Sequence, residues 1–147
     1  MSAATGDSSG QGSSEILAVD LPLDLTAVET ARQALSGLLA PWRVDERILN
    51  RIEVVLEELV SNVVRHADSV GHLRIEASVA DRTLNLAVID DGAPFDPLAM
   101  PERDRYSDLE LAIPGGQGIP LVRKLTREVS YERSGDENCI RCRMDIS

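Results

Sequence analysis

The sequence predicts an α+β protein, a two-layer sandwich in which helices cover one face of a mixed, mostly antiparallel sheet. Three observations carry this prediction. Two segments repeat apolar residues every three or four positions, and two later pairs of segments alternate apolar and polar residues around short turns. The segments follow in the order strand, helix, helix, strand, strand, long loop, helix, strand and strand. With 147 residues, of which 43% are hydrophobic, the chain can form one core but not two ordinary domains.

Charge and composition argue against several classes of function. The 25 acidic and 15 basic side chains give a net charge of −10, which is unsuited to holding nucleic-acid phosphates. The aromatic residues, one Trp, two Tyr and one Phe, are too few for base-stacking platforms. No apolar run approaches the roughly 20 residues that cross a bilayer, and the N-terminus lacks the pattern of a secretion signal. We therefore expect a cytoplasmic protein with neither a membrane nor a direct nucleic-acid partner.

The N-terminal segment differs in composition from the rest of the chain. Residues 1–14 are rich in Ser and Gly and contain no branched aliphatic side chain, so burial cannot offset their ordering entropy. We expect a flexible tail there and a single domain over residues 15–147. The domain is expected to open with a strand from Glu15 to about Leu23.

Two helices are expected next. Thr26-Ala27-Val28-Glu29 has the pattern of a capping box and precedes a run of apolar residues at helical spacing, which Pro41 ends. A longer helix is expected from Asp45 to about Ala67. Its apolar stripe consists of Ile48, Ile52, Val55, Leu56, Leu59 and Val63.

The second half of the chain is expected to contribute most of the sheet. Residues 73–79 and 84–88 alternate in polarity and indicate an antiparallel hairpin. Residues 95–117 show no sustained period, and loops of that length are usually functional lids or disordered. A helix over 119–125 and two strands over 128–133 and 139–146 complete the prediction.

The only two cysteines form a C-x-x-C pair, Cys139 and Cys142. Such a pair can bind zinc or act in redox chemistry, but no second cysteine pair or nearby histidine completes a zinc site. The segment also looks extended and does not open a helix, and a spacing of three in a strand points side chains to opposite faces. We interpret the two residues as small apolar side chains of a strand.

Polar side chains border the apolar stripe of the longer helix. Glu58, Asn62 and His66 are spaced four apart and therefore lie on one side of the helix. A solvated flank would show the same pattern. A carboxylate together with an amide oxygen also suits magnesium binding and the deprotonation of a hydroxyl group.

Two further features lie at the ends of predicted elements. Asp90-Asp91-Gly92 follows a buried-looking strand, and it is either a simple turn or an anchor for an exocyclic amine such as that of adenine. Gly115-Gly116-Gln117-Gly118 precedes a helix, and it is either a plain glycine loop or a phosphate site made of backbone N–H groups.

In this order, the three features resemble the sequence boxes of the GHKL ATPase superfamily, which uses the Bergerat ATP-binding fold. The branch that the chain resembles is the RsbW/SpoIIAB-type anti-sigma-factor serine kinases, over about Leu21 to Met144. The matching stretches are Glu57–Ala67, Ile89–Pro97 and Gly115–Val122. The resemblance implies ATP and Mg²⁺ as ligands.

The resemblance also implies roles for individual residues. Glu58 would be the general base, and Asn62 would hold the magnesium that bridges the phosphates. Asp90 would bind the adenine amino group, with Gly92 packed below the ring. The lid over the phosphates would contain Gly115, Gly116 and Gly118. His66 matches a common position but is assigned no chemistry, and Glu57 should point to solvent.

One departure from the branch concerns the last box. It reads Gly-Ile-Pro-Leu here, and Pro120 stiffens the first helical turn and removes an N–H, so lid details can differ. The resemblance implies a protein serine/threonine kinase that phosphorylates a STAS-type anti-anti-sigma protein and sequesters a sigma factor. The branch commonly forms homodimers. The alternative is a nucleotide-binding regulatory module without phosphoryl transfer, whereas a histidine-kinase half is disfavoured because no phospho-accepting helices precede the domain.

Overall fold

The computed structural model describes residues 16–66, 70–99 and 118–147. Its five strands form one sheet in the spatial order β1-β2-β3-β5-β4, and every neighbouring pair among them is antiparallel. The strands are β1 (Ile16–Leu21), β2 (Leu73–Ala80), β3 (Thr83–Asp90), β4 (Glu128–Ser134) and β5 (Glu137–Asp145).

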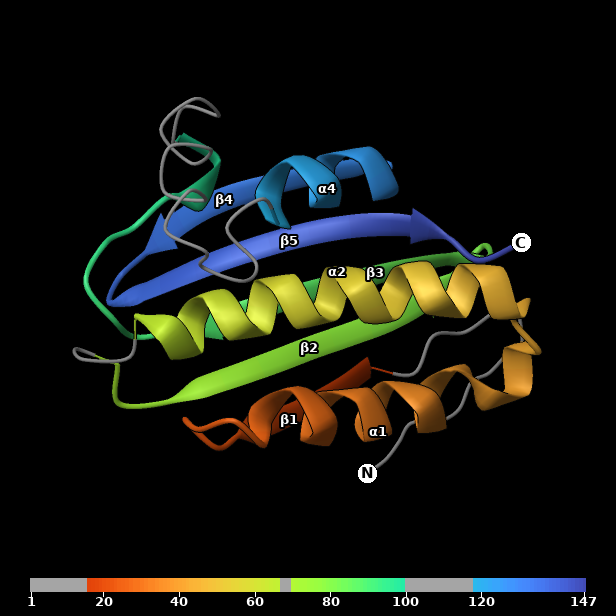
Figure 1. Ribbon diagram of the computed structural model, residues 1–147, viewed down its shortest axis with the longest axis horizontal. Helices are drawn as coiled ribbons and strands as arrows, with labels where there is room; N and C mark the ends of the chain where they lie inside the picture. Colours follow the sequence, from red (N-terminus) through yellow and green to blue (C-terminus); the bar gives the residue numbers. More distant parts are fainter. Residues whose placement is uncertain (1–15, 67–69, 100–117) are drawn as a thin grey trace, which may run out of the picture.

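The helices lie together on one face of this sheet (Figure 1). They are α1 (Ala27–Leu39), α2 (Glu46–Arg65) and α4 (Gly118–Leu125), with short 3-10 turns η2 (Ala40–Trp42) and η4 (Pro97–Ala99). Helix α1 packs on β1 and β2, α2 crosses the middle of the sheet, and α4 packs on α2 and β4. The predicted fold class and the predicted order of elements are therefore confirmed.

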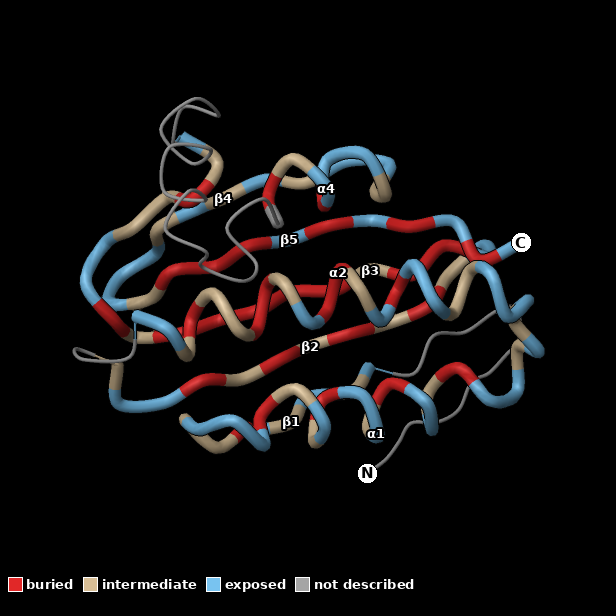
Figure 2. Tube along the Cα trace, viewed as in Figure 1, coloured by how far each residue is buried: buried red, intermediate tan, exposed pale blue. Residues whose placement is uncertain are grey.

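The core lies between the helices and the sheet, as the buried segments show in Figure 2. Helix α2 buries the predicted stripe from Ile52 to Val63, while Glu57 on its other side is exposed. Strand β2 alternates buried and half-buried residues along its whole length, with its buried side towards the helices. The period of 3.6 residues in α2 and of two residues in β2 thus gathers the apolar side chains of each element on one face, and these two faces pack against each other.

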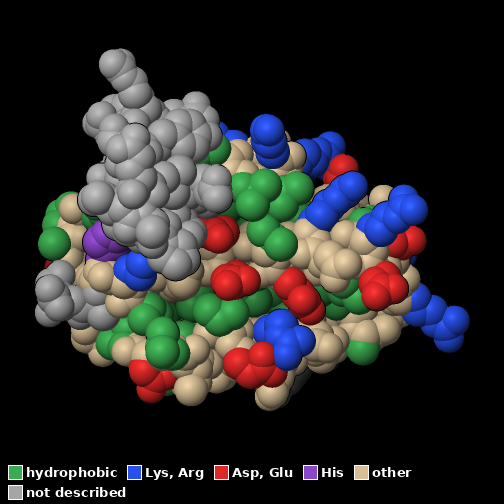
Figure 3. Space-filling view, in the orientation of Figure 1, with side chains coloured by type: hydrophobic (Ala, Val, Ile, Leu, Met, Phe, Trp, Pro, Cys, Tyr) green, Lys and Arg blue, Asp and Glu red, His purple; other side chains and the backbone are tan. Residues whose placement is uncertain are grey.

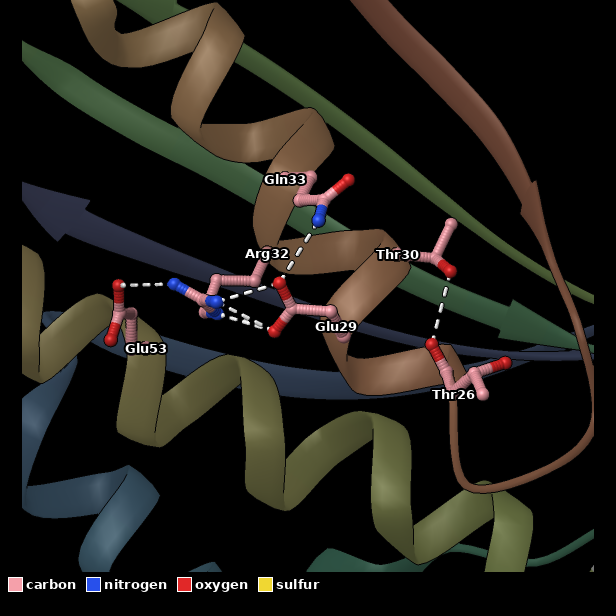
Figure 4. Close-up of polar contacts among 6 residues, drawn as sticks. All are labelled: Thr26, Glu29, Thr30, Arg32, Gln33 and Glu53. Atoms are coloured by element: carbon pink, nitrogen blue, oxygen red, sulfur yellow. Dashed lines mark hydrogen bonds and ion pairs between the residues drawn. The ribbon is translucent and has the colours of Figure 1, made fainter.

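The predicted capping box at the start of α1 is wrong. The side chain of Thr26 makes no capping bond to the helix; its Oγ1 donates to Asp24 Oδ1 at 2.5 Å, and its N–H donates to the same oxygen at 2.8 Å. Glu29 does not reach back to Thr26 either. Its carboxylate accepts hydrogen bonds from Arg32 and Gln33, and Arg32 also approaches Glu53 of α2 at 3.7 Å (Figure 4). A guanidinium one turn away competes successfully for the carboxylate.

Strand β5 lies between β3 and β4, although β4 precedes it in the chain. This arrangement pairs Asn138 at the start of β5 with Asp90 at the end of β3. It also separates the two cysteines as expected: Cys142 joins the main core, whereas Cys139 packs with Ala87 and Ile89 in a small separate cluster. Burial raises the pKa of the Cys142 thiol to about 12, so a reactive thiolate is disfavoured there.

Candidate functional site

A pocket of about 240 Å³ lies between α2 and the end of β3. Its lining includes three of the predicted site residues, Asn62, Asp90 and Gly92, together with His66. The rest of its wall is mainly apolar and comprises Leu59, Val63, Val70, Ala93, Pro94, Phe95, Pro97, Asn138 and Ile140. An apolar slot with a few polar groups is the usual form of a small-molecule site.

Helix α2 supplies one wall of the pocket. Asn62 is half-buried and faces the pocket, and one turn earlier Glu58 is also half-buried but lies outside the pocket lining. One turn after Asn62, the ring of His66 stacks on Phe95 with 5.1 Å between ring centroids, and its Nδ1 lies 2.9 Å from the backbone oxygen of Asn62. The predicted polar stripe is therefore one continuous side of the helix, and its last two members, Asn62 and His66, line the pocket.

The end of strand β3 supplies the opposite wall. Asp90 is only 9% exposed, and its Oδ1 accepts hydrogen bonds from the N–H of Gly92 at 2.8 Å and from Nδ2 of Asn138 at 3.1 Å. Its Oδ2 accepts none from the part of the chain that the structure describes. The carboxylate is thus fixed at one oxygen, and Gly92 beside it brings bare backbone to the pocket surface.

Sequence reasoning missed Asn138. It is 4% exposed, and it bonds to Asp90, to the carbonyl oxygen of Ala93 at 2.9 Å and to the N–H of Phe95 at 3.2 Å. The sequence places Asn138 only in a turn between two strands, and no motif or periodicity marks it. The pairing of β5 with β3 is what brings it to the pocket.

Asp91 points away from the pocket and organises the connection between α2 and β2. Its Oδ1 accepts hydrogen bonds from the N–H groups of His72 at 2.9 Å and Gly71 at 2.6 Å, and the His72 ring lies 3.3 Å from its other oxygen. These N–H donors, His72 first, lower the pKa of the Asp91 carboxyl. A Cβ added at Gly71 would lie 3.0 Å from Asp91 Oδ2, so this close approach favours glycine.

The predicted phosphate loop lies mostly outside the described residues. Gly115 and Gly116 fall outside them, whereas Gly118 is the first residue of α4, with Pro120 in its first turn as expected. From the same helix, the guanidinium of Arg123 donates to the backbone oxygen of Leu98 at 3.3 Å and so ties α4 to η4.

The predicted residues that it contains distinguish this pocket from the rest of the described surface. On the helix-covered face, acidic side chains gather along α2, while Lys and Arg side chains lie towards α4 (Figure 3). A larger groove of about 340 Å³ lies on the helix-free face of the sheet, with Glu76, Asn85 and Arg141 in its lining. None of the predicted site residues lines that groove, so the pocket beside α2 is the candidate site.

In a comparison with family models, residues 21–144 match the histidine kinase-like ATPase domain. The chain belongs to this family. Within it, a serine/threonine-protein kinase of Bordetella bronchiseptica, BtrW, is 27% identical over 124 residues, which are 82% of this chain and 87% of that protein. The serine-protein kinase RsbW of Staphylococcus aureus is 23% identical over 134 residues, 85% of this chain and 84% of that protein. This ATPase domain is therefore distantly related to serine kinases.

Two solved structures share the fold. The RsbU and RsbW domains of a Mycobacterium tuberculosis protein match with a TM-score of 0.63 and 18% identity, covering 90% of this chain and 32% of that one. This chain thus spans about a third of that protein chain. The SiaB–SiaC complex from Pseudomonas aeruginosa matches with a TM-score of 0.58 and 11% identity, covering 87% of this chain and 88% of the other.

The described residues fit the ligands that the family implies. Asp90 offers a buried acceptor beside bare backbone, which suits the exocyclic amine of adenine. No cluster of three His, Cys, Asp or Glu side chains in the described ranges could hold a metal alone. Magnesium, however, usually takes one or two protein ligands and completes its shell with phosphates and water. Asn62 can be such a ligand once a nucleotide is bound.

Within the described residues, no helix is long and apolar enough to cross a membrane.

Proposed function

We propose that this protein is an ATP-dependent serine/threonine protein kinase that acts as an anti-sigma factor and phosphorylates a STAS-type anti-anti-sigma partner. The observation that carries the proposal is the convergence of Asn62, Asp90 and Gly92 on one pocket in a histidine kinase-like ATPase domain. The distant relationship to serine kinases that span the same length of chain supports the choice of phosphoryl acceptor.

We assign each predicted site residue a contact with one part of the bound nucleotide or with the metal ion. Asp90 holds the amino group of adenine, and Gly92 lets the ring lie close to the backbone. Asn62 would supply one oxygen ligand to Mg²⁺, and the bound ion would neutralise charge on the phosphates. Gly115, Gly116 and Gly118 are assigned to the lid, because backbone N–H groups before a helix suit phosphate oxygens.

Glu58 is assigned to the proton transfer. It is half-buried on α2 and lies one turn from Asn62, so it is on the same side of the helix as the predicted metal ligand and not on the solvent side. As a general base it would accept the proton of the attacking hydroxyl group. Phosphoryl transfer otherwise relies mainly on positioning and charge neutralisation.

Binding is tested by thermal unfolding. ATP with Mg²⁺ should raise the melting temperature of the wild-type protein, because a ligand that binds only the folded state stabilises it. Asn62→Ala and Asp90→Asn should each abolish this rise. A rise of wild-type size in both variants would contradict the assigned site.

Transfer is tested with radiolabelled ATP and a STAS protein encoded near the gene. Glu58→Ala should keep the ATP-induced rise in melting temperature and lose transfer, whereas Glu57→Ala, on the solvent side of the same helix, should keep both. Transfer by Glu58→Ala at the wild-type rate would remove Glu58 from the role of base. ATP binding by the wild-type protein without transfer to any STAS protein would favour the alternative, a nucleotide-binding module that sequesters a partner.

A further inference from the structure

We infer that Asn138 is a positioning residue of the nucleotide site: its side-chain amide orients the Asp90 carboxylate so that one carboxylate oxygen is kept for the exocyclic amine of the base. The inference rests on the proposed ATP binding and adds a residue that neither the motifs nor the family match assigns. It concerns recognition of the purine and not the transfer of phosphate.

The first support is the place of Asn138 in the sheet. It is 4% exposed at the start of β5 and lies directly opposite Asp90 of β3. A buried amide whose polar atoms lack hydrogen bonds destabilises the folded state, so each of these atoms is expected to have a partner. Both of its polar atoms are in fact hydrogen-bonded to residues around the pocket.

The second support is that its partners determine the orientation of the amide. Nδ2 donates to Asp90 Oδ1 at 3.1 Å and to the Ala93 carbonyl oxygen at 2.9 Å. Oδ1 accepts from the Phe95 N–H at 3.2 Å and from the Tyr131 hydroxyl at 2.5 Å. A flipped amide would set its NH₂ against the Phe95 N–H and its oxygen against the Asp90 carboxylate, so only one orientation satisfies every group.

The third support is that the edge strand β4 also forms a hydrogen bond with the loop that follows β3. Arg133 of β4 donates from Nη1 to the backbone oxygen of Gly92 at 2.8 Å and lies 3.4 Å from Asn138 Oδ1. Residues 90–95 are therefore fixed from β4 and β5 as well as by their own turn. Rigid support of this kind is what keeps a recognition group in a productive geometry.

The consequence for Asp90 follows from its two oxygens. Oδ1 is occupied by the Gly92 N–H and by Asn138 Nδ2, and Oδ2 accepts no hydrogen bond from any described residue. Since Asp90 lines the pocket, Oδ2 is the acceptor left for an amino group on a purine. Without the donor from Asn138, the carboxylate can rotate. Both of its oxygens can then accept hydrogen bonds from other neighbours, and neither is kept for the purine amino group.

The test compares ATP with purine riboside triphosphate, which lacks the 6-amino group. Calorimetry at pH 8 with Mg²⁺ should show that the wild-type protein binds ATP about 10- to 100-fold more tightly, as expected for a hydrogen bond to a charged group. Asn138→Asp has the same size and keeps the acceptor but loses the donor. It should weaken ATP binding by about the same factor and leave affinity for the analogue within about twofold.

Two further variants sharpen the result. Tyr131→Phe removes one donor to Asn138 and should lower the preference for ATP by about 2- to 10-fold while preserving the fold, which circular dichroism checks. It decides the question if Asn138→Asp does not fold. Asn85→Asp makes the same change in charge on the helix-free face of the same sheet, and it should change neither affinity.

The outcomes separate the inference from the proposed function. No ATP binding by the wild-type protein would refute the proposed function itself. If the wild-type protein binds ATP but does not prefer it to the analogue, or if the variants weaken both nucleotides equally, ATP binding stands and the positioning role of Asn138 is wrong. A loss confined to ATP supports the role, because a merely structural defect would affect both ligands.

Discussion

Two neighbouring aspartates at the end of β3 act on different parts of the molecule. Asp90 is buried and lines the pocket, whereas Asp91 holds the N–H groups of Gly71 and His72. Successive residues of an extended chain point to opposite sides, so one dipeptide can serve both the ligand and the loop. The Asp-Asp-Gly motif therefore combines a residue that lines the pocket with one that holds a neighbouring loop.

The lowered pKa of Asp91 makes a prediction about acid sensitivity. A carboxyl whose pKa is lower in the folded state stabilises the fold fully above its ordinary pKa of about 3.9 and loses this effect as pH falls through the lower folded-state value. Asp91→Asn should therefore reduce the free energy of unfolding at pH 7, and the difference from wild type should shrink below about pH 4. Urea unfolding at pH 7, 5, 4 and 3 measures this. A difference that stays constant over this range would contradict the assignment.

At the scale of the elements, α2 supplies one wall of the site. Its buried stripe fixes the rotation of the helix against the sheet, and that rotation points Asn62 into the pocket and Glu57 to solvent. The helix begins at a side-chain cap, because Asp45 accepts a hydrogen bond from the N–H of Arg47 at 2.8 Å. The first helix has no such side-chain cap, although its sequence pattern suggests one.

The cap of α2 should be measurable. Asp45→Ala removes the acceptor and should lower the free energy of unfolding by about 1 kcal/mol, the usual effect of losing an N-cap. Asp45→Asn keeps an oxygen acceptor and should remain close to wild type. Chemical denaturation of the three proteins checks this, and an equal loss in both variants would attribute the effect to charge and not to the cap.

At the scale of the whole molecule, one core supports a site at its edge. Leu56 lies on the buried face of α2, is 1% exposed and does not line the pocket. The pocket itself uses the neighbouring part of the same helix, from Leu59 to Val63, and the C-cap residue His66. Stability of the fold and affinity for nucleotide should therefore be separable by substitution.

Leu56→Ala tests this separation. It should lower the free energy of unfolding by about 2–5 kcal/mol through the cavity that it leaves. ATP affinity measured by calorimetry at a temperature where the variant is folded should stay within about threefold of wild type. Leu25→Ala is the matched control, because Leu25 is 91% exposed and its truncation should change neither quantity. A large loss of affinity in Leu56→Ala would mean that the core and the pocket are coupled.

Much of this architecture follows from residue spacing. The apolar period of 3.6 along α2, the alternation in β2 and the order of elements are local properties, and they were sufficient for the fold class. The polar stripe through Asn62, and Asp90 and Gly92 at the end of β3, could likewise be predicted as candidate site residues. The absence of a side-chain cap on α1 could not be predicted from the sequence. Several side chains within a few residues of one another compete there for the same hydrogen-bonding groups.

The role of Asn138 is decided by long-range pairing. It lies 48 positions from Asp90 in the chain, and the two meet only because β5 inserts between β3 and β4. No local pattern encodes that insertion, since a strand has the same alternation at the edge of a sheet as beside any neighbour. Local periodicity thus settles which faces are buried and which motifs are present, while the free energy of packing the whole sheet selects the neighbours that complete the pocket.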